Sequence, residues 1–444
     1  MAFETEQSLK GIELFREQYL YRHPPVSEMN YTLDFTDEEI SLLRSLAEHV
    51  ARIADTDAMK EKAGRWTALH DLKDNTPVIF VDPENGWNEV MTNDVIRCRN
   101  QLARTWENML RKDIFSAEMI QDDRVITRNF NVPYFWTGND FGIRPKIEHS
   151  SVKGGAYHIS AAIEDYEEDF QKLSFPRLSV DWDKSHELLD YANKVFGGIL
   201  NCRLNMKWQW DDSFLDRFVE LRGMEDFMCD FVAEPEWVTT MMTFITDGVM
   251  KRFDWLEEQG LLSLNNDETY LGTGGQGFTT DLPASDFGGK VRTRDMWGMM
   301  QAQETVSVNP DHFGELILPH FKRLASRFGL VHYGCCEPYD PRWKYVKEIP
   351  NLRHVSVSPW AKFDTVPELL GTNYVASVKL KPTPLAMPDM NEDVVRRDCR
   401  RAVEETYGGI CEFIMKDNHT IGGNPDHLIR WTRIMREEID RRYG

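Results

Sequence analysis

The sequence has no uninterrupted run of about 18 apolar residues, the length that a membrane-spanning helix requires. It is also short of positive charge, because 52 Lys and Arg against 73 Asp and Glu give a formal net charge of −21. Nucleic-acid binding needs a basic surface, so this balance argues against a nucleic-acid partner. The 7 cysteines are an odd number and fit a reducing compartment better than a disulfide framework. The charged amino terminus does not match a signal peptide, and we predict a cytoplasmic globular protein.

Internal repeats, low-complexity linkers and a complete nucleotide motif are missing too. The glycine-rich segment Gly-Thr-Gly-Gly-Gln-Gly at 272–277 lacks the Lys-Ser/Thr of a P-loop and opens no convincing helix. We therefore expect a flexible loop at the edge of the fold rather than a phosphate site. With 41% apolar residues, the chain can nevertheless bury a large core.

Strand-like and helix-like segments alternate along most of the chain. Apolar runs predict strands at 76–81, 125–136, 177–181, 329–334, 355–358, 374–380 and 411–415. Helical spacing predicts helices at 94–115, 214–229, 235–259, 313–328, 392–406 and 425–442. Alternation over this length favours parallel strands, and a (β/α)8 TIM barrel is the commonest solution. We predict an α/β fold in which residues 1–75 form an amino-terminal helical arm and residues 76–444 form the barrel.

One predicted strand ends in an unusual cluster, Leu-Val-His-Tyr-Gly-Cys-Cys-Glu-Pro at 330–338. Imidazole and thiolate are zinc ligands, and His332, Cys335 and Cys336 lie close enough in sequence to share one ion. The alternative is that the two cysteines are small buried residues of the core. In a barrel the carboxyl ends of all strands meet at one face, here called the mouth.

Other residues that follow predicted strands would join this cluster at the mouth. His419 follows the strand at 411–415 and is our fourth zinc ligand, although a surface histidine is equally consistent with the pattern. An acid and an aromatic wall would line the substrate pocket, since aromatic and apolar side chains line most ligand sites. The substrate-binding candidates are Glu84, Trp136, Phe278, Trp297 and Trp360.

Several motifs together resemble one known family. They are Leu-Arg-Gly-Met-Glu-Asp-Phe-Met at 221–228, Asn-Pro-Asp-His-Phe at 309–313, Val-His-Tyr-Gly-Cys at 331–335 and His-Thr-Ile-Gly-Gly at 419–423. In order and spacing these resemble the uroporphyrinogen decarboxylase superfamily, and within it the corrinoid-dependent methyltransferases, over residues 77–440. The resemblance implies the barrel fold and is less specific for the reaction.

Two departures from the family narrow the function. The decarboxylases carry an arginine-rich segment after the first strand, whereas this chain has Asp-Pro-Glu-Asn-Gly-Trp at 82–87, which disfavours a porphyrinogen rich in carboxylates. The thiol-directed methyltransferases hold zinc on a His-x-Cys pair and a later Cys. Here the spacing is His332-x-x-Cys335, and His419 lies near the position of the later Cys.

The resemblance implies a methyltransferase that moves a methyl group from a small methylated substrate, such as a methoxylated aromatic, to a corrinoid. No Asp-x-His-x-x-Gly signature is present, so the corrinoid would arrive on a separate protein. Zinc, or an acid such as Glu304 or Asp417, would activate the leaving heteroatom. The resemblance leaves open whether the protein is a monomer or a homodimer.

Three other functions remain open from the sequence. The protein could transfer methyl from a methyl-corrinoid to a thiol or folate. It could be a metal-independent decarboxylase or lyase that binds a small acid through Arg128, Arg177 and Arg292. Outside the enzymes, it could be a corrinoid-binding chaperone, which would bind cobalamin without turnover.

Overall fold

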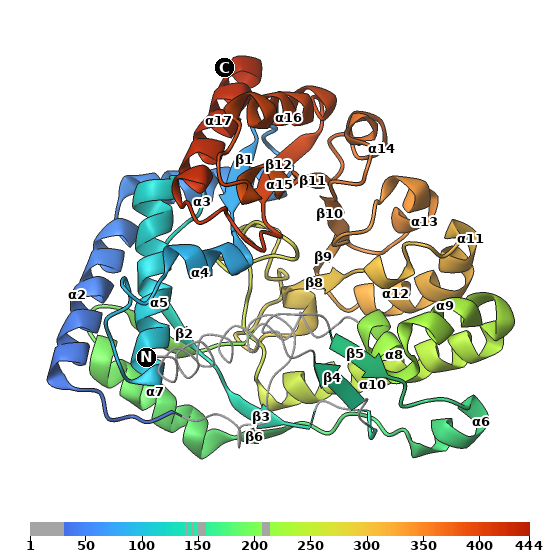
Figure 1. Ribbon diagram of the computed structural model, residues 1–444. Helices are drawn as coiled ribbons and strands as arrows, with labels where there is room; N and C mark the ends of the chain where they lie inside the picture. The colour runs from blue at the N-terminus through green and yellow to red at the C-terminus, as the bar shows by residue number, and fades with distance from the viewer. Residues whose placement is uncertain (1–30, 139–140, 144–145, 150–156, 207–213) are drawn as a thin grey trace.

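The computed structural model describes residues 31–138, 141–143, 146–149, 157–206 and 214–444. Its central feature is a six-stranded parallel sheet in the order β1-β12-β11-β10-β9-β8 (Figure 1). The strands are β1 (Val78–Val81), β8 (Trp297–Met300), β9 (Leu330–Tyr333), β10 (Leu352–Val357), β11 (Val375–Lys379) and β12 (Ile410–Met415). The first strand pairs with the last, as it does when a chain wraps around a (β/α)8 barrel.

A second parallel pair, β2 (Asn129–Val132) with β7 (Asn201–Leu204), falls between β1 and β8 in the chain. Over the described ranges, no backbone ladder joins β2 to β1 or β7 to β8, so the strands do not form a closed ring there. The fold is therefore mixed α/β with a six-stranded parallel sheet. It is compatible with the predicted TIM-barrel-like architecture.

Side chains cover both open edges of the six-stranded sheet. On β1, the Asp123 carboxylate accepts a hydrogen bond from the Ile79 N–H at 2.7 Å, and the Asp123 N–H donates to the Ile79 carbonyl at 2.8 Å. On β8, the Asn265 amide accepts from the Trp297 N–H at 2.9 Å and donates to the Trp297 carbonyl at 3.0 Å. Buried backbone groups need partners, and these side chains supply them in place of a neighbouring strand.

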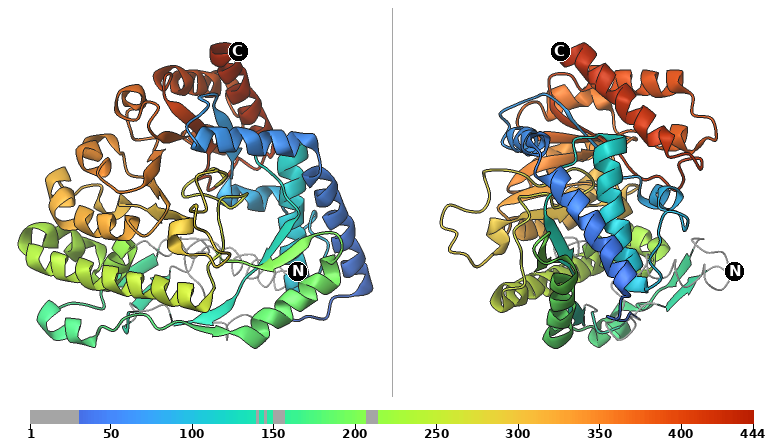
Figure 2. Two further views of the ribbon diagram at one scale, coloured as in Figure 1. Left: turned by 180° about the vertical axis from the view of Figure 1, so that it is seen from behind. Right: turned by 90° about the vertical axis from the view of Figure 1, so that its left-hand side faces the viewer.

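Helices lie outside the curved sheet and alternate with its strands (Figures 1 and 2). They are α4 (Trp87–Val90), α5 (Gln101–Phe115), α6 (Tyr166–Asp169), α7 (Trp182–Phe196), α8 (Phe214–Arg222), α9 (Met224–Ala233), α10 (Pro235–Gln259), α11 (Pro310–His312), α12 (Leu318–Ala325), α13 (Trp343–Val346), α14 (Val366–Leu369), α15 (Thr383–Ala386), α16 (Glu392–Glu405) and α17 (Asp426–Tyr443). Two antiparallel pairs also form, β3 (Phe135–Thr137) with β6 (Ser179–Asp181) and β4 (Lys146–His149) with β5 (Tyr157–Ser160).

The amino-terminal arm is helical where it is described. It holds α2 (Asp37–Ala54) and α3 (Asp57–His70). Thr36 and Glu39 form a capping box at the start of α2, in which each backbone N–H donates to the other side chain. α2 lies side by side with α5 (Figure 2, right) and also packs on α7. Residues 1–30 of the predicted arm lie outside the described residues.

The helical stretch before β8 agrees with the prediction for 235–259, but the single helix predicted at 214–229 is two helices that extend to Ala233. α8 and α9 are separated by Gly223, whose φ of +81° is a conformation that favours glycine. α10 begins at Pro235, as expected, because proline needs no N–H partner in a first helical turn. No helix in the part of the chain that the structure describes is long and apolar enough to cross a membrane.

The glycine-rich segment 272–277 is buried inside the sheet, and the expectation of a flexible edge loop is wrong. A Cβ added at Gly272 would lie 2.3 Å from the His332 ring. One added at Gly274 would lie 2.8 Å from Ile414, and one at Gly275 would lie 2.5 Å from the Glu412 carboxylate. These glycines therefore allow the backbone to approach the inner side chains of β9 and β12 closely. Figure 1 shows this stretch of chain, between α10 and β8, crossing the interior.

Candidate functional site

Charged and sulfur-bearing residues gather where β1, β8, β9, β11 and β12 end. This face is the mouth, because parallel strands bring their carboxyl ends to one side. The loops that follow these strands carry the acids, lysines and thiols described below: Asp82, Glu84, Glu304, Cys335, Cys336, Glu337, Lys379, Lys416 and Asp417.

Two buried lysines bring positive charge to the mouth. The Lys416 Nζ lies 3.1 Å from the Glu84 carboxylate and 3.9 Å from Asp417. Burial disfavours the charged amine, but the neighbouring Tyr270 and Glu84 outweigh burial and hold the pKa of Lys416 well above its usual value. The Lys379 Nζ is also buried, lies 3.7 Å from the Asp417 carboxylate and makes no hydrogen bond. The mouth thus holds two buried lysines, each within 3.7 Å of a carboxylate.

The two adjacent cysteines have different chemical characters. Their Sγ atoms lie 3.7 Å apart, with Cys335 buried and Cys336 exposed. The hydrogen bond with Cys335 and the charge of Lys379 together lower the pKa of Cys336 to about 7, while partial burial opposes them. The same hydrogen bond, together with burial, raises the pKa of Cys335 well above its usual value. Cys336 is therefore the nucleophilic thiolate of the pair.

Glu304, in the loop after β8, forms an acid pair with Asp216. Burial, followed by a hydrogen bond with Asp216 of α8, raises the pKa of Glu304 to about 10. Glu337 stands nearby with its own pKa raised by burial, and it accepts from the Ala302 N–H at 2.7 Å. A carboxyl with its pKa raised in this way can donate a proton. The predicted acid Glu304 thus lies beside Asp216, and its catalytic role stays a prediction.

The loops after β1 and β12 hold two acids in left-handed backbone conformations. Glu84 has a φ of +48° and Asp417 a φ of +60°, and such angles are uncommon for residues other than glycine. Burial raises the pKa of Glu84. The Lys416 ammonium contacts both acids, so the predicted residues Glu84 and Asp417 do lie together.

A cavity of about 290 Å³ lies beside the mouth, between the β1 and β2 segments. It shares Asp82 and Tyr270 with the surroundings of Lys416. Its other polar lining residues include Arg124 and Asp113, and burial raises the pKa of Asp113 to about 6. Its volume is near the lower limit for small-molecule pockets.

The four predicted zinc ligands are not gathered into one site. His332 lies within β9 and faces the interior, where Nδ1 lies 2.5 Å from His354 Nδ1 and Nε2 lies 2.9 Å from the Gly334 carbonyl. His419 lies elsewhere, with Nδ1 3.4 Å from the Asn85 amide. Both ring nitrogens of His332 are engaged, so neither is free for an ion at the mouth in this structure. Zinc on His332, Cys335, Cys336 and His419 stays a prediction.

The predicted aromatic wall is not assembled either. Trp297 is the first residue of β8 and therefore lies at the opposite end of the strand, fully buried, with its Nε1 donating to the Gly277 carbonyl. Trp136 is buried in the core and Phe278 packs in a neighbouring core cluster, where its carbonyl contacts His70. Trp360 is 73% exposed beside Lys381. Trp297 was expected at the mouth because the sequence around it is apolar and did not reveal that a strand begins at this residue.

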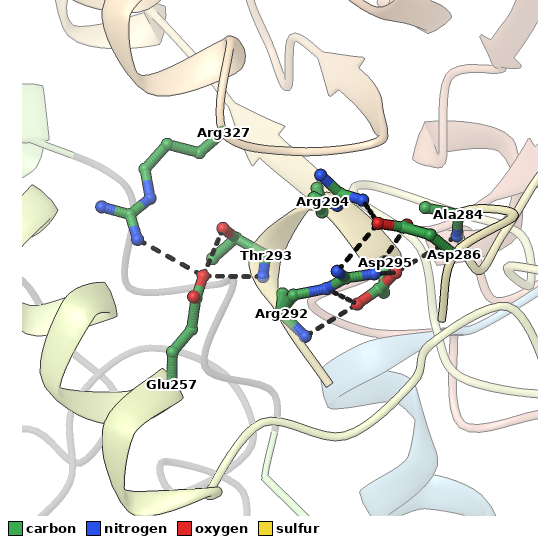
Figure 3. Close-up of polar contacts among 8 residues, drawn as sticks. All are labelled: Glu257, Ala284, Asp286, Arg292, Thr293, Arg294, Asp295 and Arg327. Atoms are coloured by element: carbon green, nitrogen blue, oxygen red, sulfur yellow. Dashed lines mark hydrogen bonds and ion pairs between the residues drawn. The ribbon is translucent and has the colours of Figure 1, made fainter. Parts of the chain in front are cut away.

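The arginines considered for a substrate carboxylate belong to other contacts. Arg128 pairs with Asp55 and donates to the Ile199 carbonyl at 2.8 Å. Arg292 pairs with Asp286 and Asp295, next to Arg294 in a network just before β8 (Figure 3). Arg177 is exposed. The cations at the mouth are instead Lys379 and Lys416, which the sequence analysis did not identify. Each lies at the carboxyl end of an apolar strand, and that pattern could have revealed them.

One group of possible metal ligands occurs among the described residues: His70, His354 and Glu412, whose ligand atoms all lie within 4.8 Å of one another. Sequence reasoning missed this group because His70 ends a helix of the amino-terminal arm. The sequence contains one indication of this group, because Glu412 is a carboxylate within an apolar strand that is buried throughout.

No family model and no curated protein matches this sequence. Among solved structures, a methyltransferase from Methanosarcina mazei is similar to the chain. Sequence identity is 11%, the match covers 86% of this chain and 99% of that chain, and the TM-score is 0.47. A likeness of this degree carries no argument about activity.

Proposed function

We propose that the protein is a methyltransferase that moves a methyl group from a small methylated substrate, such as a methoxylated aromatic, to a corrinoid held by a separate protein. The motif resemblance to corrinoid-dependent methyltransferases supports the class. The observation that carries the chemistry is the contact of half-buried Glu304 with Asp216, where burial and then this hydrogen bond raise the pKa of Glu304 to about 10. In this proposal β2 and β7 are the remaining strands of an incompletely closed (β/α)8 barrel.

An ether or amine is a poor methyl donor because its leaving heteroatom departs as a strong base. Glu304 would donate its proton to that heteroatom as the carbon–heteroatom bond breaks, and Asp216 would stabilise the position of the carboxyl. A reduced corrinoid, when its carrier protein docks, supplies the nucleophile that accepts the methyl group.

Other mouth residues would hold the substrate rather than react with it. The Lys379 and Lys416 ammonium groups would stabilise an acidic substituent or the developing phenolate. The cavity of about 290 Å³ beside Tyr270 is large enough for a single substituted ring.

Replacement of the acid tests this proposal. A Glu304→Gln variant keeps the shape and loses the proton, so demethylation of methoxylated aromatics in the presence of a corrinoid protein should slow by about 10²- to 10⁴-fold. Glu315→Gln, an exposed substitution shortly after this loop, should leave the rate unchanged. The readouts are release of the phenol and methylation of the corrinoid. Equal rates for Glu304→Gln and the wild type would exclude Glu304 as the acid.

A second function is favoured by the buried Lys379, whose ammonium has no hydrogen-bond partner. Asp417 lies 3.7 Å from this ammonium and leaves its hydrogen-bonding capacity unused, which suits a substrate carboxylate, as a decarboxylase or lyase acting on a small acid would require. Release of CO2 from an acid substrate without any corrinoid would favour this function over methyl transfer.

A further inference from the structure

His70, His354 and Glu412 meet inside the sheet, away from the mouth. His70 ends α3, while His354 and Glu412 are the third residues of β10 and β12. All three side chains are fully buried. The His354 Nε2 lies 3.1 Å from a Glu412 carboxylate oxygen. Three elements far apart in sequence thus direct ligand atoms to one point.

The hydrogen-bond partners of these histidines fix which ring nitrogens carry protons. A carbonyl only accepts, so the contact with Gly334 places a proton on His332 Nε2. His332 Nδ1 must then accept from His354 Nδ1 in their 2.5 Å contact, which leaves His354 Nε2 with a bare lone pair. In the same way, the Phe278 carbonyl at 2.9 Å places the His70 proton on Nδ1 and leaves its Nε2 bare.

Geometry brings the unprotonated atoms together. The ligand atoms of His70, His354 and Glu412 all lie within 4.8 Å of one another, and all three residues are fully buried. Two imidazole lone pairs and one carboxylate therefore face one another.

Four atoms at this point have no hydrogen-bond partner: His70 Nε2, His354 Nε2 and both Glu412 oxygens. Leaving buried acceptors unpaired is costly, and here all four are acceptors. A proton on Glu412, whose pKa burial raises to about 7, would serve one contact with His354. Even with this proton on Glu412, the Nε2 atom of His70 would have no hydrogen-bond donor.

We propose that His70, His354 and Glu412 bind one Zn²⁺ ion. Two imidazoles and a carboxylate are an established set of three protein ligands for zinc, and the two carboxylate oxygens bring the number of donor atoms to four. The ligands' other nitrogens are already oriented by the Phe278 carbonyl and His332, as second-sphere partners of metal-bound histidines commonly are. The glycine-rich segment closes the site, because Gly275 packs against Glu412. The ion would tie α3 to β10 and β12.

Metal analysis of the whole chain tests this site without reference to methyl transfer. Wild-type protein exposed to Zn²⁺ and then desalted should retain one zinc per chain, and Glu412→Gln and His70→Gln should retain far less. His419→Ala and Cys336→Ser should retain zinc like the wild type, because both residues lie at the mouth. Retention of zinc by both ligand variants, or its loss in the mouth variants, would overturn the assignment.

Cobalt substitution keeps the test decisive where a ligand variant fails to fold. Wild-type protein loaded with Co²⁺ should show the visible bands of a nitrogen- and oxygen-ligated tetrahedral ion and no thiolate-to-cobalt charge-transfer band. Its melting temperature should rise on addition of Zn²⁺. A thiolate band would place the metal on Cys335 or Cys336 instead, and absence of both binding and thermal shift would exclude the site.

Discussion

Cys336 should react with alkylating reagents at a pH where an ordinary thiol is nearly inert. The cause is structural, since the Cys335 thiol and the Lys379 ammonium both favour the thiolate and lower the pKa of Cys336 from 9.0 to about 7. At pH 6 about a tenth of such a thiol is ionised, against about a thousandth for an unshifted one. A less basic thiolate is also less nucleophilic, by about eightfold for this shift. The net expectation is alkylation about tenfold faster at pH 6.

The measurement is differential labelling with iodoacetamide between pH 5 and pH 9, followed by peptide mass spectrometry. Cys229 on α9, the other exposed thiol among the described residues, serves as an internal reference. A Cys335→Ala variant removes the hydrogen-bond donor and should move the Cys336 labelling curve to higher pH. If Cys336 and Cys229 show the same pH dependence in the wild type, the proposed thiolate environment is refuted.

Two further predictions concern stability. The Asp123 carboxylate is buried, pairs with Arg65 and Arg436 and covers the β1 edge, so Asp123→Asn should lower the free energy of unfolding by about 3–5 kcal/mol in a urea titration. Glu438 has its pKa lowered to about 2, first by the hydrogen bond from Arg400, so its stabilisation is complete above about pH 4.5 and is lost as the pH falls towards 2. The urea midpoint of Glu438→Gln should therefore fall less steeply over this range than that of the wild type.

Each stability prediction has an outcome that would contradict it. Asp364→Asn, an exposed change, is the control for Asp123→Asn, and equal midpoints for the two variants would show that Asp123 does not hold the β1 edge. Parallel acid profiles for Glu438→Gln and the wild type would mean that the arginine contacts of Glu438 do not persist in solution.

The strongly periodic parts of the fold were predictable from the sequence. α10 begins at Pro235 and its length follows from the helical spacing of apolar residues. β11 and β12 were predictable because both strands are buried on both faces and read as nearly continuous apolar runs. The open sheet edges were not, because Asp123 and Asn265 resemble ordinary loop residues until their backbone partners are known.

The candidate site was predictable only in part, for reasons of strand geometry. Glu84 and Asp417 follow predicted strands and reach the mouth region as expected, whereas Glu304 follows β8, a strand that was not predicted. His332 does not, because β9 continues to Tyr333 and side chains alternate between the faces of a strand. Its imidazole therefore points into the sheet towards His354, while the cysteines lie beyond the strand end.

In this position His332 connects two groups of polar residues by hydrogen bonds. On one side its Nδ1 accepts from His354, and on the other its Nε2 donates to the Gly334 carbonyl, next to Cys335. The Cys335 carbonyl in turn accepts from Ser356 at 2.9 Å, and its N–H donates to Glu337 at 2.9 Å. A tautomer change that moved the His354 proton from Nδ1 to Nε2 would thus reverse the donor on His332 and break its bond to Gly334. The loop that carries Cys336 is therefore held in place by the same hydrogen bonds that leave His354 Nε2 free for a metal ion.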